Sequence, residues 1–163
     1  MAIGWHYSAA EYNVGDICKR TSELRLSDQQ SAGELIIRIE HPDGEEVGRT
    51  IRANAFYLWG QKDFGAKLWR ATQTQDGERR PFFYHMEYDD ADVLHMGDLD
   101  HYTLCYQNTA NDAVARQAAR LYWGGLSTGI SRRIEILVKK AKVISKVRYS
   151  PEYGTYFSPA REP

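Results

Sequence analysis

Glu135 is the residue whose surroundings in the sequence most clearly require a chemical explanation. It lies within the run Ile134-Glu135-Ile136-Leu137-Val138, a pattern typical of a strand with apolar flanks. Placing a carboxylate in such a strand costs free energy unless a partner compensates its charge. Glu135 is therefore the first candidate for a functional carboxylate.

A lone histidine near the start of the chain is the second candidate. It stands in the run Trp5-His6-Tyr7-Ser8. A histidine in a strand is more often structural than catalytic. Tyr57 and Trp59, at the end of another predicted strand, supply aromatic rings that suit the wall of a pocket, although core packing explains them equally well. Taken with Glu135, His6 favours a nucleotide site over a metal or thiol site.

A third group of residues has the types and spacing of a metal site. His95, Asp98 and His101 offer two imidazoles and a carboxylate at intervals of three residues. On a helix they would share a face, but Gly97 and the neighbouring aspartates favour a loop, in which spacing does not fix geometry. A solvated acidic loop is the favoured interpretation, and a metal-dependent hydrolase is the alternative.

Several classes of enzyme are disfavoured because their motifs do not occur in the sequence. It contains no P-loop, no Gly-x-Gly-x-x-Gly, no Gly-x-Ser-x-Gly elbow, no zincin histidine pair and no zinc-finger spacing. Kinases, Rossmann dehydrogenases and serine hydrolases are therefore disfavoured. Cys18 and Cys105 stand apart without a Cys-x-x-Cys spacing, and this pattern predicts buried thiols without a redox role.

The length and composition of the chain are those of one ordinary globular domain. The sequence has 163 residues, of which 42% are hydrophobic and 26% charged. It predicts a single domain over residues 1–163, with 150–163 as a tail that packs or frays. No apolar run approaches the ~18 residues of a membrane span. The start has no basic segment followed by an apolar core, so the predicted location is the cytoplasm, without membrane attachment.

Charge is unevenly distributed along a chain whose net charge is −1. Residues 87–100 are acidic, whereas 132–148 carry seven bases against Glu135 alone, which gives 7 − 1 = +6. Such a stretch attracts nucleic acid or the phosphates of a cofactor. Lysines also protect strand edges from pairing with other chains, and this simpler interpretation stays open.

The elements that must position these residues are mostly strands. The pattern predicts two or three helices, one after Asp63 and a firmer one that begins at Asn111 or Asp112 and ends at Gly124-Gly125. It also predicts a turn at 41–44 and a loop over the acidic 87–100. The predicted fold class is α+β. The predicted strands cover 35–40, 55–59, 81–86, 134–138 and 143–149.

In order and spacing, these motifs resemble the ADP-ribosyltransferase superfamily, in particular small bacterial branches typified by rifampin ADP-ribosyltransferase. An early strand carries an aromatic-His-x-Ser motif, and Gly15 follows His6 by 15 − 6 = 9 positions. A strand with the aromatic pair Phe56-Tyr57 follows, then a strand that leads into the acidic segment, then the late strand with Glu135. The resemblance spans roughly residues 5 to 147.

This resemblance implies a split, strongly bent pair of small antiparallel sheets with NAD held between them. It implies that His6 contacts the adenine-side ribose and that Tyr57 stacks on the nicotinamide ring. Glu135 would hold the nicotinamide ribose and stabilise the oxocarbenium-like state formed as nicotinamide leaves. Arg52, or the bases near Glu135, would meet the pyrophosphate. The expected NAD-binding residues are thus His6, Tyr7, Ser8, Arg52 and Tyr57.

Two positions qualify this resemblance. The rifampin-type enzyme relies on an aspartate in the acidic loop, so Asp98 competes with Glu135 as the main catalytic acid; the strand context favours Glu135. Arg133 occupies the place where protein-modifying members often carry Gln or Glu. An acceptor of nucleic acid or small-molecule type is therefore favoured over protein, with DNA or RNA slightly ahead because of the basic stretch.

Rival interpretations belong to different functional classes. A non-catalytic module would use the basic surface and the aromatics to bind RNA or a protein. A metal-dependent hydrolase would use His95, Asp98 and His101. Within the transferase interpretation, the sequence leaves open whether the protein is a toxin, a defence factor or a housekeeping enzyme.

Overall fold

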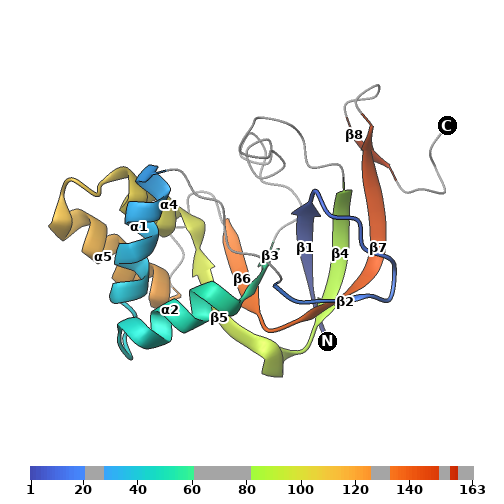
Figure 1. Ribbon diagram of the computed structural model, residues 1–163, viewed down its shortest axis with the longest axis horizontal. Helices are drawn as coiled ribbons and strands as arrows, with labels where there is room; N and C mark the ends of the chain where they lie inside the picture. The colour runs from blue at the N-terminus through green and yellow to red at the C-terminus, as the bar shows by residue number, and fades with distance from the viewer. Residues whose placement is uncertain (21–27, 61–81, 126–132, 151–154, 158–163) are drawn as a thin grey trace.

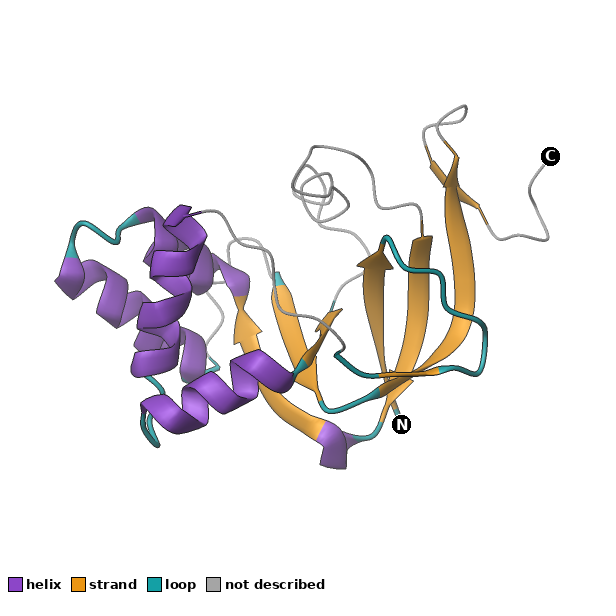
Figure 2. Ribbon diagram, in the orientation of Figure 1, coloured by secondary structure: helices purple, strands orange, loops and turns teal. Residues whose placement is uncertain are grey.

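The computed structural model describes residues 1–20, 28–60, 82–125, 133–150 and 155–157. Helices gather at one end of a long sheet (Figures 1 and 2). The helices are α1 (Asp28–Ile39), α2 (Glu45–Asn54), α4 (Leu99–Gln107), α5 (Asp112–Trp123) and the short 3-10 helix η2 (Asp90–Asp92). The strands are β1 (Ala2–Ser8), β2 (Ile17–Cys18), β3 (Phe56–Trp59), β4 (Phe82–Tyr88), β5 (Val93–Asp98), β6 (Ile134–Val138), β7 (Ala141–Ser150) and β8 (Thr155–Phe157).

The strands form one antiparallel sheet in the order β2-β7-β4-β1-β3-β6-β5, with β8 paired to β7. Its two halves meet at a narrow seam. Strand β1 shares seven registered pairs with β4 and β3 shares four with β6, but β1 and β3 share only Trp5↔Trp59. The predicted α+β fold with antiparallel strands is confirmed. The expected pair of sheets is, in the described residues, a single hydrogen-bonded sheet with this seam.

Several predicted elements are confirmed. The strands expected over 55–59, 81–86, 134–138 and 143–149 correspond to β3, β4, β6 and β7. Helix α5 begins after Asn111, whose side chain accepts a hydrogen bond from the backbone of Val114. The 41–44 segment turns through a hydrogen bond from Gly44 N to His41 O. The helix predicted after Asp63 lies outside the described residues, as does most of the 150–163 tail.

Residues 35–40 were predicted as a strand, and this is wrong because 35–39 belong to helix α1 and Glu40 follows its last residue. The β-branched residues Ile36, Ile37 and Ile39 favour a strand locally. The buried positions Gly33, Glu34 and Ile37 instead repeat at helical spacing, and packing against α4 and α5 overrides the local preference. Because α2 and α4 were not predicted either, the described residues hold four α-helices rather than two or three.

The acidic stretch 87–100 was expected to be a loop, and this too is wrong. It continues β4, forms η2 and β5, and enters α4. Gly97 lies within β5, at a position where a Cβ would overlap Cε2 of the Tyr122 ring. The residue that suggested a loop therefore allows a close approach between helix and strand.

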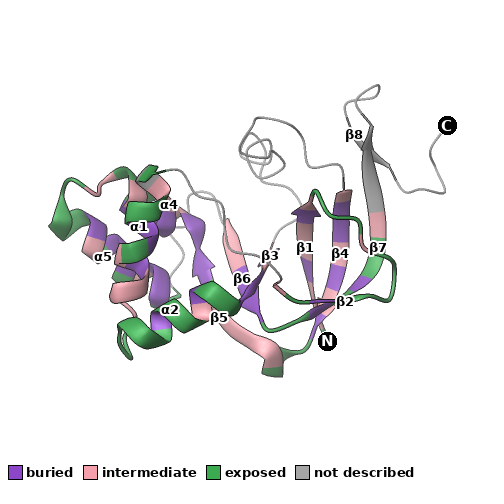
Figure 3. Cartoon of the chain, viewed as in Figure 1, coloured by how far each residue is buried: buried purple, intermediate pink, exposed green. Residues whose placement is uncertain are grey.

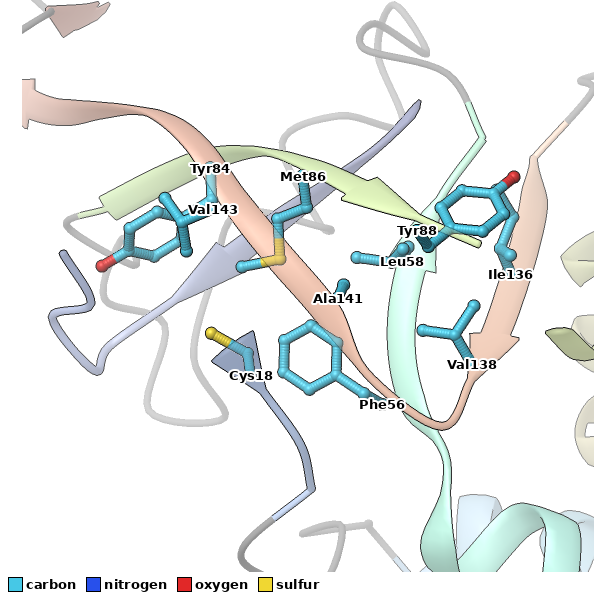
Figure 4. Packing of buried hydrophobic residues seen from close by; sticks show 10 residues of the cluster. All are labelled: Cys18, Phe56, Leu58, Tyr84, Met86, Tyr88, Ile136, Val138, Ala141 and Val143. Atoms are coloured by element: carbon cyan, nitrogen blue, oxygen red, sulfur yellow. The ribbon is translucent and has the colours of Figure 1, made fainter. Parts of the chain in front are cut away.

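Two apolar clusters lie in different parts of the fold. Figure 3 shows buried positions along the strands and on parts of α4 and α5, with exposed positions over much of α2. Figure 4 shows the cluster on one face of the sheet, here called the sheet core: Cys18, Phe56, Leu58, Tyr84, Met86, Tyr88, Ile136, Val138, Ala141 and Val143. The second, the helical core, comprises Ile37, Leu99, Tyr102, Cys105, Ala115, Ala118, Ala119, Tyr122 and Trp123.

Both cysteines are buried and unpaired, as predicted, and burial raises the pKa of each thiol to about 11. Alternation along β3 divides its side chains between two faces. Phe56 and Leu58 enter the sheet core, so Tyr57 and Trp59 face the opposite side. Among the described residues, no helix combines the length and the apolar character needed to cross a membrane.

Candidate functional site

Glu135 lies between two neighbouring strands, opposite Trp59 of β3 and Gly97 of β5. Ile134 and Ile136 pack on the sheet core, so the Glu135 side chain points to the other face, where the helices lie. Its side chain is 13% exposed. The charged residue that stood out in the sequence is thus partly buried at the boundary between the sheet and the helices.

The two carboxylate oxygens of Glu135 differ in their surroundings. Oε1 accepts hydrogen bonds from Arg52 Nη1 at 2.6 Å and from the Tyr122 hydroxyl at 2.7 Å. Oε2 accepts none from a described residue. If Oε2 were buried, it would be a buried oxygen without a hydrogen-bond partner. The described part of the chain contains no such atom, so Oε2 is accessible to solvent. One oxygen is fixed, and the other is open.

Arg52 is the partner that compensates this charge. Its side chain is 2% exposed. The guanidinium forms a fork with Glu34, from Nε to Oε1 at 2.7 Å and from Nη2 to Oε2 at 2.8 Å, and Tyr102 donates to the same Oε2 at 2.7 Å. Burial alone would raise the pKa of Glu34, but Arg52 and Tyr102 lower it below its ordinary value.

The structure gives Arg52 protein partners at the guanidinium that was predicted to contact a pyrophosphate. The guanidinium lies against two carboxylates, Glu34 and Glu135, and a phosphate could reach it only if these moved. Arg52 therefore supports Glu135. Sequence reasoning missed Glu34 and Tyr122 as partners of Arg52, because they lie 18 and 70 residues from it in the chain and no local pattern links them.

Tyr57 binds the backbone at the C-terminal end of α2. Its hydroxyl donates to the Arg52 carbonyl at 2.5 Å, and Arg20 Nη1 donates to the same carbonyl at 2.9 Å. The guanidinium carbons of Arg20 and Arg52 lie 5.2 and 5.1 Å from the centre of the Tyr57 ring. The ring predicted to stack on nicotinamide thus already has cationic neighbours within the protein.

His6 bridges the seam between the two halves of the sheet. Its Nδ1 lies 2.8 Å from the Tyr57 carbonyl oxygen, and because that oxygen is an acceptor, Nδ1 carries the proton. The ring packs 4.4 Å from Phe56, on the sheet-core face. The structure therefore joins His6 to the backbone of Tyr57, but it places the imidazole and the Glu135 carboxylate on opposite faces of the sheet.

The other two residues expected to bind the cofactor have local partners. Tyr7 is buried and stacks on Phe83, with ring centres 4.6 Å apart. Ser8 Oγ accepts a hydrogen bond from the Ala10 backbone at 3.0 Å. Both residues follow His6 on β1 or at its end, and neither is joined to Glu135 by a hydrogen bond in the described residues.

Asp98, the rival catalytic acid, has a structural position. It is 1% exposed, and its carboxylate caps α4 by accepting from the Asp100 backbone at 2.8 Å. His95 Nε2 donates to the Tyr122 carbonyl at 3.0 Å, and burial lowers the pKa of His95 to about 4. Within the described residues, no group of three His, Cys, Asp or Glu side chains is arranged to hold a metal.

The described bases of the stretch 132–148 do not converge on Glu135. Lys139 and Lys140 are exposed between β6 and β7, four and five residues beyond Glu135 and thus roughly 13 Å or more along the strand. Lys146 pairs with Glu11 at 3.5 Å. Arg133 lies closer in sequence, but it is ion-paired with Asp100 of α4 at 3.0 Å. The described bases of this stretch thus form no cluster around the open carboxylate oxygen.

What the site offers chemically is a carboxylate whose position is fixed on one oxygen and whose other oxygen can meet a ligand. The fixing groups come from α2 and α5, and the carboxylate comes from β6. Such an arrangement suits stabilisation of positive charge or acceptance of hydroxyl hydrogen bonds. No protein-family model, curated protein or solved structure matches this chain.

Proposed function

We propose that the protein is an NAD-dependent ADP-ribosyltransferase in which Glu135 is the catalytic carboxylate. The observation that carries the proposal is the asymmetry of this group, since Oε1 is held by Arg52 and Tyr122 while Oε2 is open. Cleavage of the bond between nicotinamide and ribose develops positive charge on the ribose, as in glycoside hydrolysis. A fixed carboxylate beside that charge stabilises the transition state more than the ground state.

Other residues contribute to this proposal indirectly. His6 and Tyr57 fix the seam between β1 and β3, the strand next to Glu135, through the bond from the imidazole to the Tyr57 carbonyl. The proposal gives Asp98 no part in the chemistry, because its carboxylate caps α4. The proposal assigns no acceptor class, since the exposed lysines of the β6–β7 turn lie away from the carboxylate.

The test is nicotinamide release from NAD by the purified protein in the presence of cell lysate. Glu135→Gln keeps the size of the side chain and removes its charge, and we expect release to fall at least 100-fold. Glu40→Gln is the matched control, because Glu40 is also 13% exposed and also pairs with arginine side chains, Arg116 and Arg120, on α5. We expect Glu40→Gln to retain wild-type release. Equal release by wild type and Glu135→Gln would reject the proposal.

The alternative function is a non-catalytic module that binds nucleic acid. The observation in its favour is that Lys139, Lys140 and Lys142 are all exposed at the β6–β7 hairpin. It predicts RNA binding that weakens steeply with salt, loss of that binding on replacing these lysines by glutamine, and no consumption of NAD.

For the transferase, pretreating the lysate with nuclease or with protease would show whether the acceptor is nucleic acid or protein.

A further inference from the structure

We infer that Arg52 and Tyr122 are positioning residues for Glu135, so that helices α2 and α5 set the geometry of the carboxylate as much as its own strand does. This inference rests on the proposed function for its catalytic meaning. The geometry itself is a property of the described residues and is testable without any substrate.

Arg52, Tyr122 and Glu135 form a closed triangle of hydrogen bonds around Glu135 Oε1. Arg52 Nη1 donates both to Oε1 at 2.6 Å and to the Tyr122 oxygen at 2.8 Å, and the Tyr122 hydroxyl donates to Oε1 at 2.7 Å. The cation thus also orients the phenol that it touches. Two donors from two helices fix one oxygen, and rotation of the carboxylate would break both bonds.

The guanidinium of Arg52 is itself held in one orientation. The fork with Glu34 uses Nε and Nη2, and this turns Nη1 toward Tyr122 and Glu135. A lysine would keep the charge but could not hold both carboxylates in this fixed plane. Tyr57 and Arg20 bind the carbonyl of Arg52, so the backbone that carries the guanidinium is held as well.

The Tyr122 ring reaches the carboxylate because Gly97 has no side chain. Gly97 is the registered neighbour of Glu135 on β5, and a side chain at Gly97 would overlap the Tyr122 ring. The missing side chain therefore leaves the space that the ring fills. Next along α5, the Trp123 indole donates to the Ile37 carbonyl of α1 at 2.6 Å, which ties this end of the helix to its neighbour.

The main test compares Tyr→Phe variants of two tyrosines that are both fully buried. Tyr122→Phe removes a donor to Glu135, whereas Tyr84→Phe removes a hydroxyl in the sheet core that bonds to the backbone of Ala10 and Tyr12. For nicotinamide release, we expect Tyr122→Phe to lower kcat about tenfold with the KM for NAD within twofold of wild type. Tyr84→Phe should leave kcat within twofold. Equal effects of the two variants on kcat would overturn the inference.

A second measurement keeps the inference testable if Tyr122→Phe does not fold or if the wild type releases no nicotinamide. NMR of the wild-type protein should show guanidinium protons of Arg52 and the Tyr122 hydroxyl proton protected from exchange with water. Both signals should shift or vanish in Glu135→Gln and remain in Glu40→Gln. Signals that are unprotected, or unaffected by Glu135→Gln, would overturn the inference.

The two measurements separate failure of the inference from failure of the proposed function. Protected signals that respond to Glu135→Gln, without nicotinamide release, would support the positioning of Glu135 and reject the transferase. Release that depends on Glu135, with unprotected signals, would support the transferase and reject the positioning role of Arg52 and Tyr122.

Discussion

Strands β3 and β6 contribute side chains to two regions that are stabilised in different ways. On one face, Leu58 and Ile136 enter the apolar sheet core (Figure 4). On the other, Tyr57 and Glu135 enter a polar cluster organised around Arg52. Apolar contacts are non-directional and tolerate changes of shape, whereas a buried charge requires a specific partner. The same strands therefore provide general stability on one face and a defined carboxylate on the other.

The largest effect on stability is expected from breaking the polar cluster at its centre. Arg52→Ala leaves Glu34 and Glu135 without their shared cation, and we expect the free energy of unfolding to fall by about 3–5 kcal/mol. Adding Glu34→Gln and Glu135→Gln to the same chain should recover more than half of that loss, because the unpaired charges are then removed. Urea denaturation measures both. A loss below about 1 kcal/mol for Arg52→Ala would contradict this account.

A cavity in the sheet core should have a somewhat smaller effect, of a different kind. Leu58 is 2% exposed, and Leu58→Ala should lower the free energy of unfolding by about 3 kcal/mol. Since Leu58 points away from the Glu135 face, the folded variant should keep the wild-type ratio of kcat to KM for NAD. A selective loss of kcat in the folded variant would show that the two faces are not independent.

The smallest expected effect is a pH dependence that arises on the helical side. Burial lowers the pKa of His95 to about 4, so between pH 6.5 and 4 the unfolded chain binds more protons than the folded one. Stability should therefore fall with decreasing pH over this window, by at most about 3 kcal/mol. His41, whose pKa is also lowered by burial, adds a change of the same sign.

His95→Gln checks the contribution of this histidine. Glutamine keeps a donor for the Tyr122 carbonyl but does not titrate. Urea denaturation at a series of pH values should give a shallower decline for this variant than for wild type between pH 6.5 and 4. An unchanged slope would assign the acid sensitivity to other groups.

The parts of the fold that sequence predicted correctly are those with a local signal. Alternation and apolar runs marked β3 and β6, and Asn111 with Gly124-Gly125 marked α5. Helix α1 could not be recognised locally, because isoleucines favour a strand and only its packing against α4 and α5 explains the helix. Local pattern thus succeeded where it agreed with tertiary packing.

The candidate site shows the same division. Glu135 was identifiable because a charge within an apolar strand is unusual. Its support was not, because Arg52 lies 83 residues from Glu135, 70 from Tyr122 and 18 from Glu34 in sequence. These contacts exist only once the helices pack against the sheet. A buried arginine with two carboxylate partners has no local sequence signature.

The most direct test of the central claim uses NAD labelled separately on nicotinamide and on adenine, incubated with the protein and cell lysate. We predict that wild type frees the nicotinamide label and attaches the adenine label to an acceptor, and that Glu40→Gln does the same. Glu135→Gln should do neither. Both labels remaining on NAD with wild type, or equal transfer by Glu135→Gln, would contradict the assignment of Glu135 as the catalytic carboxylate of an ADP-ribosyltransferase.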